Sequence, residues 1–198
     1  MGTRSLTAVF ADGEYKIAQY GEYDGYPEGQ GMTALEFARG ALCIEAGRQD
    51  FSNQLRNVRF VEQEELASMY ASVGVTGLWC TMDQTAAFDR KWPYFSRNNG
   101  ANILNLVMNA DEEVLTRNNI EFAGDSLCCE YAYVIDLDKK TFEAYSGFNK
   151  TPPTPGERFA HMPPDDGYYP VKLVASWSLD ELPSDKDFYA AFGEDCDE

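Results

Sequence analysis

Apolar and polar residues alternate along residues 5–10 and 14–20, and the dipeptide Asp12-Gly13 lies between these two runs. Alternation with a period of two is typical of a strand with one buried face. Asp-Gly is a strong signal for a two-residue hairpin turn, because glycine tolerates the positive φ that the turn requires. The pattern therefore predicts a first β-hairpin. Counted outward from the turn residue by residue, Arg4 is expected opposite Gly21.

β-Branched and aromatic residues concentrate in residues 129–136 and 141–147, and this composition predicts a second hairpin. A similar run in residues 168–179 predicts one more strand. In the first of these runs, one face is expected to carry Tyr131, Tyr133, Ile135 and Leu137, and the other Ala132, Val134 and Asp136. Asp136 and Asp138 are a candidate pair for a divalent cation, but Asp beside a hairpin turn more often serves the turn itself.

Three segments between the hairpins carry apolar residues at helical spacing. They are residues 32–47 with Thr33 as a candidate cap, residues 61–74, and residues 96–109 with Ser96 as a candidate cap. A short turn is expected in residues 111–118 and a last helix within residues 180–191. Residues 47–60 are ambiguous.

Residues 77–97 show no regular pattern. Trp79 and Trp92 indicate a packed loop, and Pro93 breaks any helix there.

The order of these elements is hairpin, helices, hairpin, strand, which predicts an α+β fold. We expect a mostly antiparallel sheet of about five strands, formed by two hairpins and a late strand, with helices packed on it. The chain has 198 residues, the length of one domain. We assign residues 1–182 to a single globular domain and residues 183–198 to an acidic C-terminal segment that is partly helical or frayed.

The segment QYGEYDGYPEGQG, residues 19–31, is the most unusual stretch of the chain. It holds five Gly or Pro residues, three tyrosines and three acids between a predicted strand and a predicted helix. This composition predicts a shaped loop at a binding or active site, next to the start of the first strand. The candidate ligand-binding residues are Arg4, Gln19, Tyr20, Asp24, Tyr26 and Gly29.

An anionic or nucleotide-like small molecule suits this set, because arginine binds carboxylate or phosphate and tyrosines offer stacking surfaces. The glycines also precede a helix start, which favours anions, but their spacing matches neither a dinucleotide-binding motif nor a P-loop. Two structural alternatives remain open. In one, Arg4 pairs with Asp24 and pins the loop; in the other, the loop packs its own tyrosines.

Catalysis has three candidate residues. Asp24 or Asp125 serves as a general base if burial raises its pKa. Cys129 serves as a nucleophile if His161 reaches it from the proline-rich segment 149–167. The alternative for Cys129 is a reduced thiol in the core. The five cysteines and one histidine lack the spacing of a metal site, so neither a metal nor a cofactor is expected.

The formal net charge is −17, and residues 179–198 alone hold eight acids and one base. Such a chain has no basic footprint for phosphates, which argues against direct nucleic-acid binding. It favours an alternative function as an acidic interaction or inhibitor protein, a possible nucleic-acid mimic that meets a basic protein partner and performs no catalysis. No apolar run approaches the ~20 residues of a membrane span, so we expect a cytoplasmic protein with no membrane partner; a dimer stays open.

Three segments carry a resemblance to a known family: MGTRSL, EYKIAQYGEYDGYPEGQG and FAGDSLCCEYAYVIDLDKKTFEAYSGF. They resemble a family of bacterial, bacteriophage and fungal proteins that open with MGTR and carry an AQYGxxDGYPxGQG loop. The resemblance extends from residue 1 to about residue 178. The family is known only as uncharacterised, so the resemblance implies a relationship but supplies no activity. For the alternative function as an acidic inhibitor protein, it implies a phage counter-defence role.

Overall fold

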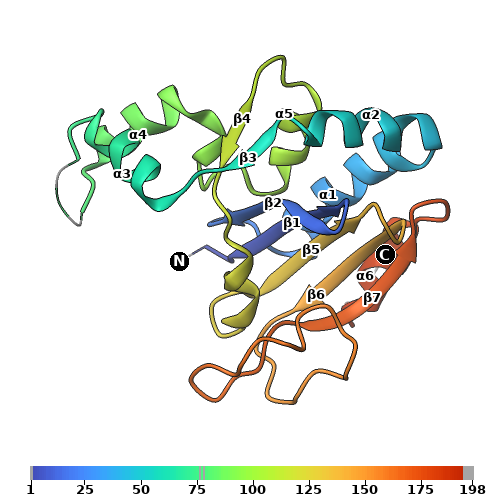
Figure 1. Ribbon diagram of the computed structural model, residues 1–198. Coiled ribbons are helices and arrows are strands. Elements are labelled where there is room, and N and C mark those ends of the chain that lie inside the picture. The colour runs from blue at the N-terminus through green and yellow to red at the C-terminus, as the bar shows by residue number, and fades with distance from the viewer. Residues whose placement is uncertain (1, 76, 78, 194–198) are drawn as a thin grey trace.

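The computed structural model describes residues 2–75, 77 and 79–193, and its centre is a five-stranded sheet (Figure 1). The strand order is β2-β1-β5-β6-β7. The strands are β1 (Ser5–Ala11), β2 (Glu14–Gly21), β5 (Tyr131–Asp136), β6 (Thr141–Ser146) and β7 (Lys172–Ser178). Neighbours pair antiparallel except β1 and β5, which pair in parallel. The predicted α+β fold with a mostly antiparallel five-stranded sheet is thus confirmed.

The first hairpin turns where the sequence predicted. Asp12 and Gly13 both have positive φ, 55° and 80°, which matches the turn that Asp-Gly favours. A bulge follows, because Val9 faces Ile17 but Phe10 faces Tyr15, which leaves Lys16 as an extra residue. Ser5 therefore faces Gly21, and the expected pairing of Arg4 with Gly21 was wrong by one residue. No local pattern in the sequence marks such an insertion.

The two faces of the sheet are covered differently. One face packs on helices α1 (Met32–Phe37), α2 (Glu45–Leu55), α5 (Ile103–Met108) and α6 (Asp185–Ala191). The other is covered by the turn Ile120–Gly124 and by the proline-rich segment, which lies on the side opposite α1 and α2 (Figure 1). The predicted alternation in β5 is confirmed, since Tyr133 and Ile135 face the helices while Ala132 and Val134 face the other layer.

The predicted helix 32–47 differs from the structure at both ends. A π-helical turn, Pro27–Gly31, runs directly into α1, and a second one, Ala38–Leu42, follows it. Thr33 is therefore inside the helical run, where its hydroxyl donates to the Gly29 carbonyl at 3.0 Å instead of capping a helix. Extended backbone at Ile44 ends the run, and the ambiguous residues 47–60 are largely α2.

A second unit packs beside the main sheet. Strands β3 (Val58–Phe60) and β4 (Val114–Thr116) pair in parallel, so residues 111–118 hold a strand where a turn was expected. Between these strands lie α3 (Gln63–Ala71), which was predicted, and α4 (Met82–Lys91), which was not. We call the described residues of Gln63–Phe95 the helical lobe; Figure 1 shows it projecting away from β6 and β7.

Three further predictions in this region need correction. A capping box between Thr81 and Gln84 starts α4, and Pro93 comes only after the helix has ended. Trp79 is 89% exposed, so it does not pack in a loop. The helix predicted for residues 96–109 is shorter, consisting of a 3-10 turn (Gly100–Asn102) and α5, and the Ser96 hydroxyl donates to Asp89 instead of capping it.

The C-terminal segment contributes to the main core. The predicted last helix is present as α6, and Phe188 in it is fully buried against Tyr133 and Phe142. The acidic end, residues 194–198, lies outside the described residues. Among the helices of the described chain, none has the length and apolar character that crossing a membrane requires.

Candidate functional site

The segment 19–31 is a tightly packed connection. The Gly25 amide donates to the Thr3 carbonyl at 2.9 Å, and the Tyr133 hydroxyl donates to the Gly25 carbonyl at 2.9 Å. A Cβ on Gly25 would lie 2.8 Å from the carbonyl carbon of Arg4, so this close approach requires glycine. Tyr26 is half exposed, with its ring centroid 6.2 Å from that of Tyr131. Asp24 is exposed and has a φ of 55°.

The glycine amides of this segment are already used. The amides of Gly29 and Gly31 both donate to the Tyr26 carbonyl, at 3.1 and 3.2 Å. A Cβ on Gly29 would lie 2.2 Å from the Asp24 carbonyl oxygen, which explains a glycine at this position. These amides hold the helical turn together, so they do not form a cradle for an anion.

Arg4 pairs with Glu130 and not with Asp24. Its backbone amide donates to Glu130 Oε1 at 3.1 Å, and its Nε lies 3.9 Å from the same oxygen. Glu130 is nearby because β5 runs parallel to β1, with Tyr131 beside Ser5. The structure therefore does not bring Arg4 and Asp24 together as an ion pair.

The three catalytic candidates lie in unsuitable surroundings, although two of them are neighbours: the Cys129 amide donates to the Asp125 carbonyl at 2.7 Å. The Asp125 carboxylate accepts the Cys128 amide at 3.1 Å and braces a turn. Cys129 is fully buried, its thiol donates to the Tyr131 carbonyl at 3.4 Å, and burial raises the pKa of the thiol well above its usual range. A raised pKa disfavours the thiolate that a nucleophile needs. Asp24 is exposed, and no residue of the described chain forms an ion pair with it.

Two of the predicted residues, Gln19 and Tyr20, do line a cavity of about 50 Å³. The other lining residues come from distant parts of the chain: Phe95, Arg97, Arg117 and Asn119. Gln19 and Tyr20 belong to strand β2. Phe95 ends the helical lobe and Arg97 lies just after it, while Arg117 and Asn119 follow β4. We call this space the Arg117 cavity.

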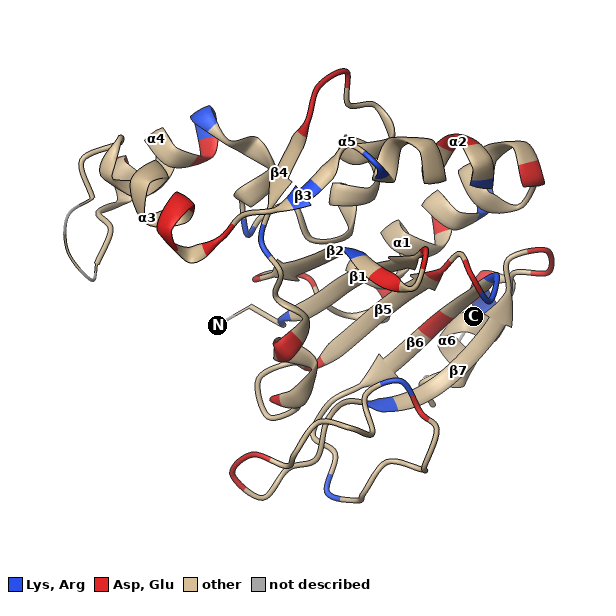
Figure 2. Cartoon of the chain, viewed as in Figure 1, with Lys and Arg blue, Asp and Glu red and all other residues tan. Residues whose placement is uncertain are grey.

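Arg117 is half-buried and has no carboxylate partner within the described residues. Its Nη2 donates to the Tyr70 hydroxyl, and its guanidinium carbon lies 5.3 Å from the centroid of the Tyr70 ring. Its Nε is buried without a hydrogen-bond partner in the described chain. Acidic residues occur in many elements of this protein (Figure 2), so the absence of a carboxylate partner beside Arg117 among the described residues is a local property of the cavity.

The other polar residues of the cavity have defined roles. Arg97 lies at the exposed rim, with its Nη2 3.1 Å from Glu22 Oε2. Gln19 donates both amide hydrogens to carbonyls, those of Tyr20 and Ser96, each at 3.0 Å, so it shapes the wall. Burial, reinforced by Glu22, raises the pKa of the Tyr20 phenol, which keeps it a neutral hydrogen-bond donor near pH 7.

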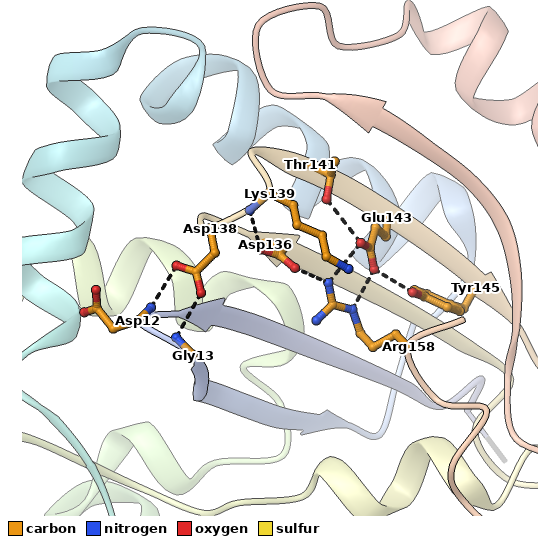
Figure 3. Close-up of polar contacts among 9 residues, drawn as sticks. All are labelled: Asp12, Gly13, Asp136, Asp138, Lys139, Thr141, Glu143, Tyr145 and Arg158. Carbon is orange, nitrogen blue, oxygen red and sulfur yellow. Dashed lines mark hydrogen bonds and ion pairs between the residues drawn. The ribbon is translucent and has the colours of Figure 1, made fainter. Parts of the chain in front are cut away.

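A second charged cluster lies on the sheet face beneath the proline-rich segment (Figure 3). Arg158 donates from Nε to Glu143 Oε2 at 2.7 Å and from Nη2 to both Glu143 Oε1 and Asp136. The Tyr145 and Thr141 hydroxyls donate to the same Glu143 carboxylate, at 2.5 and 3.1 Å. Burial alone would lower the pKa of Arg158, but its bonds to Glu143 and Asp136 raise it, which keeps the guanidinium charged.

The Asp136/Asp138 pair performs turn chemistry. Asp136 accepts the Lys139 amide at 2.8 Å, and Asp138 accepts the amides of Asp12 and Gly13 at 2.9 Å each, which ties the two hairpin turns together (Figure 3). Nowhere in residues 2–75, 77 and 79–193 do three His, Cys, Asp or Glu side chains gather as a metal site requires.

Sequence reasoning missed Arg97, Arg117 and Asn119. One signal was present, since the tripeptide Arg-Asn-Asn occurs twice, at residues 97–99 and 117–119. Comparisons with protein-family models, with curated proteins and with solved structures found no match.

Proposed function

We propose that the protein binds a compact oxyanion in the Arg117 cavity, either as free phosphate or as the phosphate or carboxylate end of a larger small molecule. The expectation of an anionic ligand at residues 19–31 thereby moves to the cavity beside Gln19 and Tyr20. Arg117 and Arg97 supply the positive charge, and Tyr20 and Asn119 supply neutral donors.

The unpaired guanidinium of Arg117 carries this proposal. A partly buried charge is costly unless a partner compensates it, and buried arginines are therefore usually paired. In a chain with a net charge of −17, carboxylate partners are abundant, yet none in the described residues lies against Arg117. An oxyanion in the cavity would supply the missing partner through charge-assisted hydrogen bonds.

The size of the cavity limits the ligand. A water molecule needs at least 10–15 Å³ of such space, so a cavity of about 50 Å³ accepts a few waters or one phosphate-sized group. A whole nucleotide is too large. A nucleotide-like ligand would enter only with a terminal phosphate, leaving its base outside the cavity.

Isothermal titration calorimetry with inorganic phosphate, methyl phosphate and acetate tests the proposal. We expect the wild type to bind at least one of them, and the Arg117→Gln variant to bind it roughly 10- to 150-fold more weakly, the loss of one hydrogen bond to a charged group at ~1.5–3 kcal/mol. Phosphate alone binding indicates a free ion, whereas binding of methyl phosphate or acetate indicates the end of a larger molecule.

Arg56→Gln is the matched control. Arg56 is exposed just after α2, and its replacement removes the same charge at a different place on the molecule. It should bind as the wild type does. No binding of any of the three anions, or equal binding by Arg117→Gln, would contradict the proposal.

A further inference from the structure

The Arg117 cavity is a junction between three parts of the chain. Gln19 and Tyr20 belong to the edge of the main sheet, Phe95 is the last residue of the helical lobe, and Arg117 follows β4 of the small sheet. Whatever occupies the cavity therefore touches the lobe and the sheet at once.

The helical lobe has a small core of its own. Three of its buried apolar residues, Met69, Phe88 and Phe95, form a cluster separate from the main core. The rings of Tyr70 and Phe88 stack with their centroids 4.3 Å apart. A unit with so few buried side chains gains little stability from its own packing, and such units open locally at a lower free-energy cost than the main core.

The polar contacts that hold the lobe and its following segment to the sheet surround the cavity. Arg117 donates to Tyr70 of α3. Gln19 Nε2 donates to the Ser96 carbonyl at 3.0 Å, and the Glu22 amide donates to the Arg97 carbonyl at 3.1 Å. These bonds, with the Arg97–Glu22 ion pair, are among those that must break or move if the lobe swings away from β2.

We propose that the bound oxyanion is a clamp that fixes the helical lobe against the main sheet, an inference that depends on the proposed function. The anion accepts from Tyr20 of β2 in the main sheet, from Arg117, which is bonded to α3, and from Arg97, two residues after the lobe. It binds fully only when the lobe is closed, because opening separates these groups. By mass action, the closed form is then favoured by a factor of 1 + [L]/Kd, where [L] is the free anion concentration.

Hydrogen–deuterium exchange of the full chain, read by mass spectrometry, tests this clamp. The two samples contain phosphate at 100 times the Kd from calorimetry, or sodium chloride at the same ionic strength. Amides of α3 and α4 that exchange through lobe opening should slow by about 100-fold with phosphate. Amides of α2, which packs in the main core, should not change.

The variants used for calorimetry complete the test. Because its Kd is expected to be roughly 10- to 150-fold higher, Arg117→Gln should slow in α3 and α4 by only about 2- to 11-fold at the same phosphate concentration. Arg56→Gln should slow as the wild type does. Calorimetric binding of phosphate without slower exchange in α3 and α4, or with equal slowing in α2, overturns the clamp and leaves the proposed function standing. No binding in calorimetry overturns the proposed function and the clamp with it.

Discussion

Arg158 and Arg117 both come from segments outside the main sheet and reach toward it, but their surroundings are opposite. Arg158 is 8% exposed and is held by two carboxylates, Asp136 at 1% and Glu143 at 9% exposure. Arg117 is half-buried, bonds to a neutral phenol, and has no carboxylate partner within the described chain. The first arginine is already satisfied by the protein, and the second is left with unmet hydrogen-bonding capacity.

As an indication of a binding site, this difference between the two arginines matters more than the volumes of the spaces beside them. The open cleft beside Arg158 measures about 450 Å³, whereas the Arg117 cavity measures about 50 Å³. Two of the four charged residues that line the larger cleft, Glu143 and Arg158, neutralise one another. The other two, Lys139 and Glu157, are one cation and one acid, so the lining has no net charge to offer an anion. Arg158 therefore anchors the proline-rich segment to the sheet, and the smaller cavity is the better candidate for binding.

The largest effect on stability should come from replacing Arg158, and the same replacement at Arg117 is the comparison. Arg158→Met leaves two buried carboxylates without a cation, and we expect it to lower the free energy of unfolding by about 3–5 kcal/mol. Arg117→Met loses one hydrogen bond, to Tyr70, and should cost about 1 kcal/mol. Urea denaturation at pH 7 measures both values. Equal losses in the two variants would remove the distinction between an anchoring and a binding arginine.

A smaller effect should appear as a dependence on pH. Burial alone would raise the pKa of the Glu143 carboxyl, but hydrogen bonds from Arg158 and Tyr145 outweigh it, and the pKa is lowered. A carboxyl with a lowered folded-state pKa contributes stability that is present above its unfolded value, about 4.3. That contribution is lost as the pH falls through the folded-state pKa.

Glu143→Gln should therefore lower the free energy of unfolding by about 1.5–3 kcal/mol at pH 7, and its difference from the wild type should shrink below about pH 4. Denaturation curves at several pH values measure this difference. Glu112→Gln, an exposed change between α5 and β4 with no ion pair in the described structure, should match the wild type throughout. A gap for Glu143→Gln that stays constant down to pH 3 would contradict the assignment.

The fold was predictable where its signals are local. Asp12-Gly13 specifies a turn within two residues, and the alternation of Tyr133 and Val134 specifies the two faces of one strand. The parallel pairing of β1 with β5 joins Ser5 to Tyr131, and no local pattern encodes a contact across that distance. The missed helix α4 is stabilised by a capping box at Thr81. Its apolar pattern is weak because Phe88 alone among its residues is buried.

The candidate site was predictable only in part, for the same reason. Gln19 and Tyr20 lie in a segment whose composition is unusual, so reasoning from sequence reached them. Arg4 was expected to be their cationic neighbour, since it lies at the start of the adjacent strand, but in the structure Arg4 forms an ion pair with Glu130. Arg117 reaches the cavity through the small parallel sheet, which brings together segments more than fifty residues apart, such as Val58 and Val114.

The smallest change in stability should come from replacing Arg97. This variant also separates a binding role from an anchoring role most clearly. Its side chain is 60% exposed and pairs with Glu22 at the rim, a surface ion pair of ~0–1 kcal/mol. Arg97→Gln should therefore leave urea denaturation almost unchanged while weakening phosphate binding in calorimetry, because it removes one of the two cations that line the cavity. Phosphate binding as strong as in the wild type would confine the site to Arg117. A large loss of stability would instead make Arg97 a structural residue like Arg158.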